Sequence, residues 1–105
     1  MVFGWDEVRG AEVYEACHQC AMDVDKDGKN TLKKGTPIEV KVDNKCGVNK
    51  YCIPVTDPPV GLNTFHVRVK HSASHDWSSW SDERTFIYNA GEHGLLYHGG
   101  GHGEL

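Results

Sequence analysis

The chain has 105 residues, of which 38% are hydrophobic, 10% aromatic and 25% charged. This length fits a single domain with one core, and the composition is that of a folded globular protein rather than a disordered or fibrous one. The formal net charge of -4 and the scattered Lys and Arg residues argue against general nucleic-acid binding, which draws its strength from clustered positive charge.

Alternation of apolar and polar residues recurs along the chain, whereas a sustained helical period does not, so an all-β fold is expected. The predicted strands are Val2–Val8, Ala11–Val24, Thr36–Asp43, Tyr51–Val55, Asn63–His71 and Glu83–Tyr88. The first long strand is followed by a turn at Asp27-Gly28, a dipeptide preferred in hairpins.

The alternation also predicts which side chains face the core. In the third predicted strand Ile38, Val40 and Val42 share one side. The fifth alternates most regularly and directs Phe65, Val67 and Val69 inward and His66, Arg68 and Lys70 outward.

The composition changes after the last predicted strand. Residues 89–105 hold six of the twelve glycines, with one apolar island at Leu95, Leu96 and Tyr97. We therefore expect a β-sandwich over residues 1–88, followed by an extended C-terminal arm that contributes to assembly.

Several residues together form a pattern found in a known family. They are Trp5, Gly10-Ala11, Tyr14, Leu62-x-Thr64-Phe65-x-Val67-x-Val69, Trp77-Ser78-Ser79-Trp80-Ser81 and Phe86. Over residues 3–88 this pattern resembles a fibronectin type III domain, an immunoglobulin-like sandwich. The resemblance implies a core that contains Trp5, Tyr14, Phe65, Val67, Val69 and Phe86.

The chain departs from that family in two places. The family usually has tyrosine where this chain has Phe65, so a hydroxyl that ties one corner to the backbone is missing. The family's core tryptophan follows a complete first strand, whereas here it is Trp5. The domain is therefore expected to begin at its second strand, with the vacant sheet edge filled by a partner or by the arm.

The segment Trp77-Ser78-Ser79-Trp80-Ser81 resembles the WSxWS signature of class I cytokine receptors. The resemblance implies that Trp77 and Trp80 stack with Arg68 and Lys70, each contact contributing about 0.5 to 1 kcal/mol at an exposed site. A receptor module needs a secretory signal, a second domain and a membrane anchor, and none is visible in the sequence. A structural Trp/Arg ladder is the favoured interpretation.

The acidic stretch before the first turn has half of a calcium-binding loop. Its oxygen positions are matched by Asp23, Asp25 and Asp27, followed by Gly28. The twelfth position is Lys34, where a bidentate Glu is required. A charged hairpin turn is favoured over a weak calcium site.

The four cysteines leave three alternatives open: at least one disulfide, free buried thiols, or a zinc site assisted by His18. On one extended strand, Cys17 and Cys20 would lie about 10 Å apart, beyond the reach of a disulfide. Cys46 and Cys52 flank a short loop and are expected to pair with each other or with the first two.

No nucleophile, phosphate loop or paired-carboxylate motif identifies a catalytic residue, so a non-enzymatic protein is expected. The leading hypothesis is a structural subunit of a larger assembly. Within that class, the favoured candidate is a bacteriophage virion protein of the capsid, neck or tail. It would bind other subunits or copies of itself, without nucleic acid, membrane insertion or an obligatory cofactor. The alternatives are an extracellular module for carbohydrate or a cell-surface partner and a cytokine-receptor-like domain. A virion or extracellular location is expected, although no signal peptide is visible.

Overall fold

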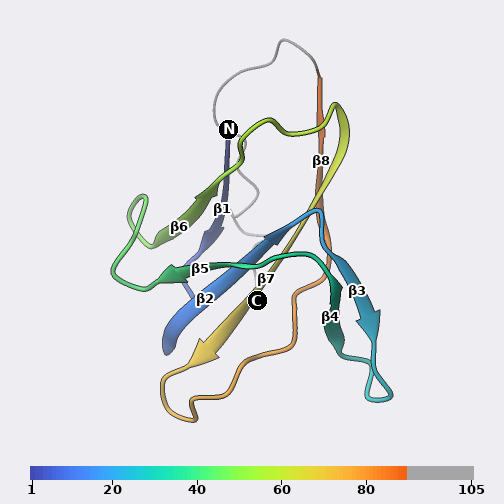
Figure 1. The fold of residues 1–105 in the computed structure, drawn as a ribbon. Helices are drawn as coiled ribbons and strands as arrows, with labels where there is room; N and C mark the ends of the chain where they lie inside the picture. The colour runs from blue at the N-terminus through green and yellow to red at the C-terminus, as the bar shows by residue number, and fades with distance from the viewer. Residues whose placement is uncertain (90–105) are drawn as a thin grey trace.

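The secondary structure consists of β-strands, and residues 1–89, which the computed structural model describes, contain no helix (Figure 1). The strands are β1 (Val2–Asp6), β2 (Ala11–His18), β3 (Ala21–Val24), β4 (Asn30–Lys34), β5 (Ile38–Lys41), β6 (Lys50–Pro54), β7 (Gly61–His71) and β8 (Arg84–Tyr88). The expected all-β class is confirmed.

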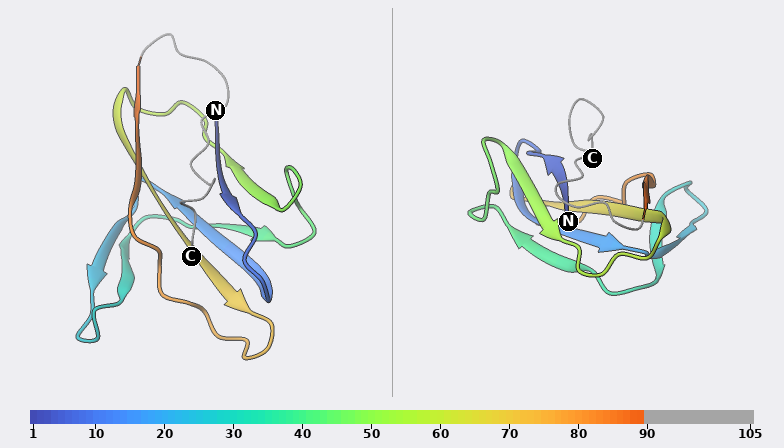
Figure 2. Two further views of the ribbon diagram at one scale, coloured as in Figure 1. Left: turned by 180° about the vertical axis from the view of Figure 1, so that it is seen from behind. Right: turned by 90° about the horizontal axis from the view of Figure 1, so that it is seen from above.

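The described strands form three antiparallel sheets. The largest has the order β5-β2-β7-β8, while β1 pairs with β6 and β3 pairs with β4. In the large sheet Tyr14 of β2 lies opposite Val40 of β5 on one side and Val69 of β7 on the other. Figures 1 and 2 show the β3–β4 hairpin projecting from the body formed by the other strands.

The core lies where the β1–β6 pair faces the large sheet. Phe3 of β1 stacks on Phe65 of β7 with ring centroids 4.0 Å apart, and Trp5 meets the edge of Tyr14 at 5.7 Å. All six core residues expected from the sequence are buried: Trp5, Tyr14, Phe65, Val67, Val69 and Phe86. Aromatic packing between the two layers therefore holds the body together.

Two tyrosine hydroxyls tie connecting segments to this core. The Tyr14 hydroxyl accepts a hydrogen bond from the Val8 amide at 2.8 Å, and the Tyr51 hydroxyl donates to the Val42 carbonyl at 2.7 Å. Phe65, which has no hydroxyl, instead stacks with Phe86 at 5.5 Å. The tyrosines that anchor loops therefore lie in β2 and β6, and not in β7, which carries Phe65.

The prediction of one long strand over Ala11–Val24 is wrong. This segment is divided into two strands, because β2 ends at His18 and Gln19 adopts a left-handed conformation with φ of 57°. The second piece pairs with β4, a strand that the sequence did not predict. Gln19 is held in the turn by its side-chain oxygen, which accepts the Thr64 amide at 2.8 Å.

The inward side of the third predicted strand is only partly buried. Val40 is buried, whereas Ile38 is 45% exposed because β5 is the last strand on that side of the large sheet. The edge position therefore overrides the alternation.

Candidate functional site

The segment Trp77–Ser81 lies along β7 and replaces a neighbouring strand. β8 pairs with the part of β7 from Gly61 to Phe65, so the next residues of β7 need other partners. The Ser78 amide donates to the Val69 carbonyl at 2.7 Å, and the Ser78 hydroxyl accepts the Val69 amide at 3.0 Å. Ser78 thereby satisfies both backbone groups of one β7 residue.

Ser81 repeats this arrangement at Val67, where the amide donates at 2.8 Å and the hydroxyl accepts at 2.9 Å. Three residues of the segment therefore advance past two residues of β7, which means that the segment is wound rather than extended. A winding with a period of three places Trp77 and Trp80 on the same side. The spacing of the two Trp-Ser pairs thus follows from how the serines bind β7.

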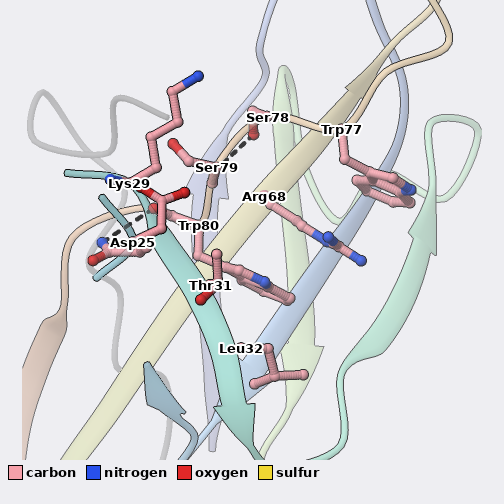
Figure 3. Close-up of a pocket in the computed structure, with 10 residues that line it drawn as sticks. Asp25, Lys29, Thr31, Leu32, Arg68, Trp77, Ser78, Ser79 and Trp80 are labelled. Atoms are coloured by element: carbon pink, nitrogen blue, oxygen red, sulfur yellow. Dashed lines mark hydrogen bonds between the residues drawn. The ribbon is translucent and has the colours of Figure 1, made fainter. Parts of the chain in front are cut away.

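Arg68 lies between the two indole rings (Figure 3). Its guanidinium carbon is 4.3 Å from the Trp77 ring centroid and 4.8 Å from that of Trp80. Its Nε donates to the Glu15 carboxylate at 2.7 Å, so the charge is balanced from the neighbouring strand. The planar guanidinium suits both contacts because its faces stack on rings while its edge binds the carboxylate.

Lys70 does not share this role, contrary to the expected second cation of the ladder. Its ammonium lies 3.7 Å from the Glu12 carboxylate, which also accepts His75 Nδ1 at 2.7 Å. Of the three positions of β7 predicted to face outward, Arg68 therefore lies with Trp77 and Trp80, and Lys70 forms an ion pair with β2. The prediction is wrong for His66, which is 5% exposed because Ser81 covers it, with 2.9 Å between His66 Nδ1 and the Ser81 carbonyl oxygen.

The Trp80 ring is buried against a disulfide between Cys17 and Cys20, with Met22 and Leu32 packed around them. The expectation that these cysteines are too far apart is wrong, since their Cα atoms are 5.7 Å apart. The left-handed Gln19 reverses the chain between them, and the assumed extended strand does not exist. Cys46 and Cys52 pair with each other, at a Cα distance of 6.0 Å.

The described cysteines are thus all in disulfides, and their sulfurs have no thiolate to offer zinc. His18, which was suggested to assist such a site, instead forms a 2.8 Å hydrogen bond between its Nε2 and Asn63 Oδ1. Within residues 1–89, no group of three or more His, Cys, Asp or Glu side chains is arranged to hold a metal ion.

The Asp-rich stretch forms the tip of the β3–β4 hairpin. One oxygen of Asp25 accepts the amides of Asp27 at 2.8 Å and Lys29 at 3.0 Å, and Asp23 lies 3.9 Å from Lys33. The Asp25 carboxylate therefore shapes a turn.

A groove of about 300 Å³ separates this hairpin from the Trp77–Trp80 segment. Asp25, Lys29 and Leu32 contribute to one wall, while Trp77 and Ser79 contribute to the other. Figure 3 shows Thr31 and Leu32 beside the Trp80 ring, with Arg68 beyond it. This groove is the candidate site.

A second crevice, of about 380 Å³, lies near the β1–β2 turn and is lined by Glu7, Lys45 and the two anchoring tyrosines among others. Burial raises the pKa of Tyr14 to about 12 and raises the pKa of Tyr51 as well. Lys45 forms a 3.1 Å ion pair with Glu7. Two of the charged groups that line this second crevice are thus paired with each other.

The hairpin wall of the groove was missed from the sequence, because β4 was not predicted. The signal available was Leu32, the one large apolar side chain in the stretch Asn30–Lys34. The expected assembly residues Leu95, Leu96 and Tyr97 lie outside the described residues.

Comparisons of this chain with protein-family models, with curated proteins and with solved structures find no match. Within residues 1–89 there is no helix long and apolar enough to cross a membrane.

Proposed function

We propose that this chain is a non-enzymatic structural subunit, a fibronectin type III-like sandwich that joins a larger assembly through the edge of β1. The leading candidate is an accessory protein of a bacteriophage capsid, neck or tail. The strand order supports the family, because a β1–β6 pair facing a β5-β2-β7-β8 sheet is the arrangement expected of the second and later strands of such a domain.

The observation that carries the assembly role is a difference between the two edges of the β1–β6 pair. The Glu7 amide donates to the Asn49 carbonyl, and the Val55 amide donates to the Met1 carbonyl. Odd-numbered residues of β1 therefore bond to β6, whereas Val2 and Gly4 direct their backbone groups to the other side.

The same register places Pro54, opposite Val2, with its ring nitrogen on the outer side of β6. Proline has no amide hydrogen, so this edge resists the addition of another strand. β1 has no proline, and β6 is its one neighbouring strand in residues 1–89. Strand addition is thus directed to β1.

The two disulfides support a location outside reducing cytoplasm, such as the surface of a particle or the extracellular space. The Trp/Arg ladder is accounted for by bracing of β7, which favours a structural over a receptor role. The occupant of the β1 edge would be another subunit, a second copy or the arm that contains Leu95, Leu96 and Tyr97.

Native mass spectrometry and sedimentation of the full chain test this function. We expect oligomers, and we expect Val2→Pro to abolish them without lowering the melting temperature, because it removes an amide that does not bond to β6. A chain that ends at Tyr88 then distinguishes the arm from a partner as the occupant. A full chain that stays monomeric at high concentration, or a Val2→Pro variant that assembles normally, would contradict the proposal.

A further inference from the structure

The groove between the β3–β4 hairpin and the Trp77–Trp80 segment has two fixed walls. The hairpin is tied to the body by the Cys17–Cys20 disulfide and by Asn30, whose amide donates to the carbonyls of Trp80 and Ser81, both at 3.2 Å. The opposite wall is fixed by the serine contacts on β7. A site whose walls are already in place loses little conformational entropy when it binds a ligand.

The lining combines an aromatic surface with uncommitted polar groups. The Trp77 side chain is half-buried, and it reaches the groove beside Arg68. Within the described part of the chain, the Lys29 ammonium, the second oxygen of Asp25 and the Ser79 hydroxyl form no hydrogen bond or ion pair. The groove thus offers a strong donor, a strong acceptor and a group that can act as either.

The charges around the groove cancel locally. Arg68 is paired with Glu15, and Lys29 faces the same space as Asp25. A strongly anionic or cationic ligand would meet as much repulsion as attraction there. A purely apolar ligand would remove water from Lys29 and Asp25 and would offer no hydrogen bonds in place of those made with that water.

We propose that this groove binds a neutral saccharide. A pyranose ring has an apolar C–H face that can lie on an indole, and adjacent hydroxyls that donate to a carboxylate and accept from an ammonium. About 300 Å³ is at the lower end of the range for small-molecule sites and suits one or two sugar units. This activity goes beyond the assembly function and requires neither oligomerisation nor the β1 edge.

The test is an NMR titration of the isotope-labelled full chain with neutral methyl glycosides of glucose, galactose, mannose and N-acetylglucosamine. We expect saturable shifts of the Trp77 indole N–H and of the amides of residues 25–32 with at least one of them. Methyl glucuronide, which carries a carboxylate, is the anionic comparison and should bind more weakly.

Two conservative variants separate binding from folding. Asp25→Asn keeps the oxygen that accepts the turn amides and changes only the second oxygen, while Lys29→Met keeps the length of the side chain. Each should weaken binding about three- to tenfold at an unchanged melting temperature. Lys45→Met, in the second crevice, is the matched control and should bind like the wild type.

Absence of shifts with every neutral glycoside would overturn the proposal. So would shifts confined to residues outside the groove, tighter binding of methyl glucuronide, or equal affinities of Lys29→Met and Lys45→Met. A monomer that binds glycosides would support the saccharide site and count against assembly, so the two proposals fail separately.

Discussion

Gly35 lies so close to Cys20 that a Cβ atom on residue 35 would be 2.3 Å from the Cys20 sulfur. The backbone of Gly35 also has a φ of 127°, a conformation that other residues rarely adopt. The hairpin therefore returns to the body by packing a bare backbone against the Cys17–Cys20 disulfide.

Gly35→Ala should accordingly destabilise the protein strongly, because the added methyl group meets a sulfur that its disulfide holds in place. Gly28→Ala is the matched control, since Gly28 also has a positive φ of 79° but open space around its Cα. We expect a loss of about 1 to 2 kcal/mol for Gly28→Ala and about 3 kcal/mol or more for Gly35→Ala, measured by urea unfolding. Equal losses would show that the contact with Cys20 contributes nothing.

Ser78 and Ser81 should each contribute to stability through their hydroxyls. Replacement by Ala removes the acceptor of the Val69 or Val67 amide and costs about 1 to 2 kcal/mol, with faster hydrogen exchange at that one amide. Ser79→Ala is the control, because Ser79 is exposed and binds neither amide. A loss for Ser79→Ala as large as for its neighbours would refute this explanation of the three-residue period.

The two tryptophans should differ in what they contribute. Trp80 is 3% exposed against the disulfide, so Trp80→Ala leaves a cavity and should cost about 3 to 5 kcal/mol. Trp77 is half-buried, and Trp77→Ala should cost about 1 to 2 kcal/mol from the lost contact with Arg68 and lost burial. Thermal melting distinguishes the two, and equal midpoints would contradict the structural ranking.

The sequence was sufficient for the body of the fold because its information is periodic and local. Phe65, Val67 and Val69 alternate with polar residues, and a half-buried strand is the one structure that this period fits. The division of Ala11–Val24 could not be predicted in the same way. It depends on the left-handed φ of Gln19, a residue type with no special preference for that conformation.

The groove could not be predicted because it joins distant parts of the chain. Asn30 contacts Trp80 across 50 residues of sequence, and this contact places the hairpin beside the indoles. Both tryptophans and Arg68 were identified from the resemblance of their segment to the WSxWS signature, whereas Lys29 was not identified, because an exposed lysine in a turn has no distinguishing pattern. The side chains of the Trp77–Trp80 wall could therefore be predicted from the sequence, whereas those of the hairpin wall could not.

The two disulfides should be reduced in a fixed order. Cys17 and Cys20 are 0% and 6% exposed, whereas Cys46 is exposed, so a thiol reductant reaches the second bridge first. Timed alkylation and mass spectrometry under native conditions should detect loss of Cys46–Cys52 well before Cys17–Cys20. In denaturant, where both are accessible, the difference in rate should disappear. Simultaneous loss in the native protein would mean that the hairpin opens readily.

Stability should fall at alkaline pH through Tyr14. Burial raises the pKa of its phenol to about 12 from the ordinary value of 10.0, even though the hydrogen bond from Val8 favours the ionised form. Between these two values the unfolded chain releases the proton and the folded chain keeps it, so the free energy of unfolding decreases as pH rises. The contribution of Tyr14 to stability is complete below pH about 10 and lost above about 12.

Urea unfolding across this range should show a shallower decline of stability for Tyr14→Phe, with the residual slope reflecting Tyr51, whose pKa is also raised. Identical slopes for the variant and the wild type would mean that the Tyr14 phenol ionises as readily in the folded protein as in the unfolded chain.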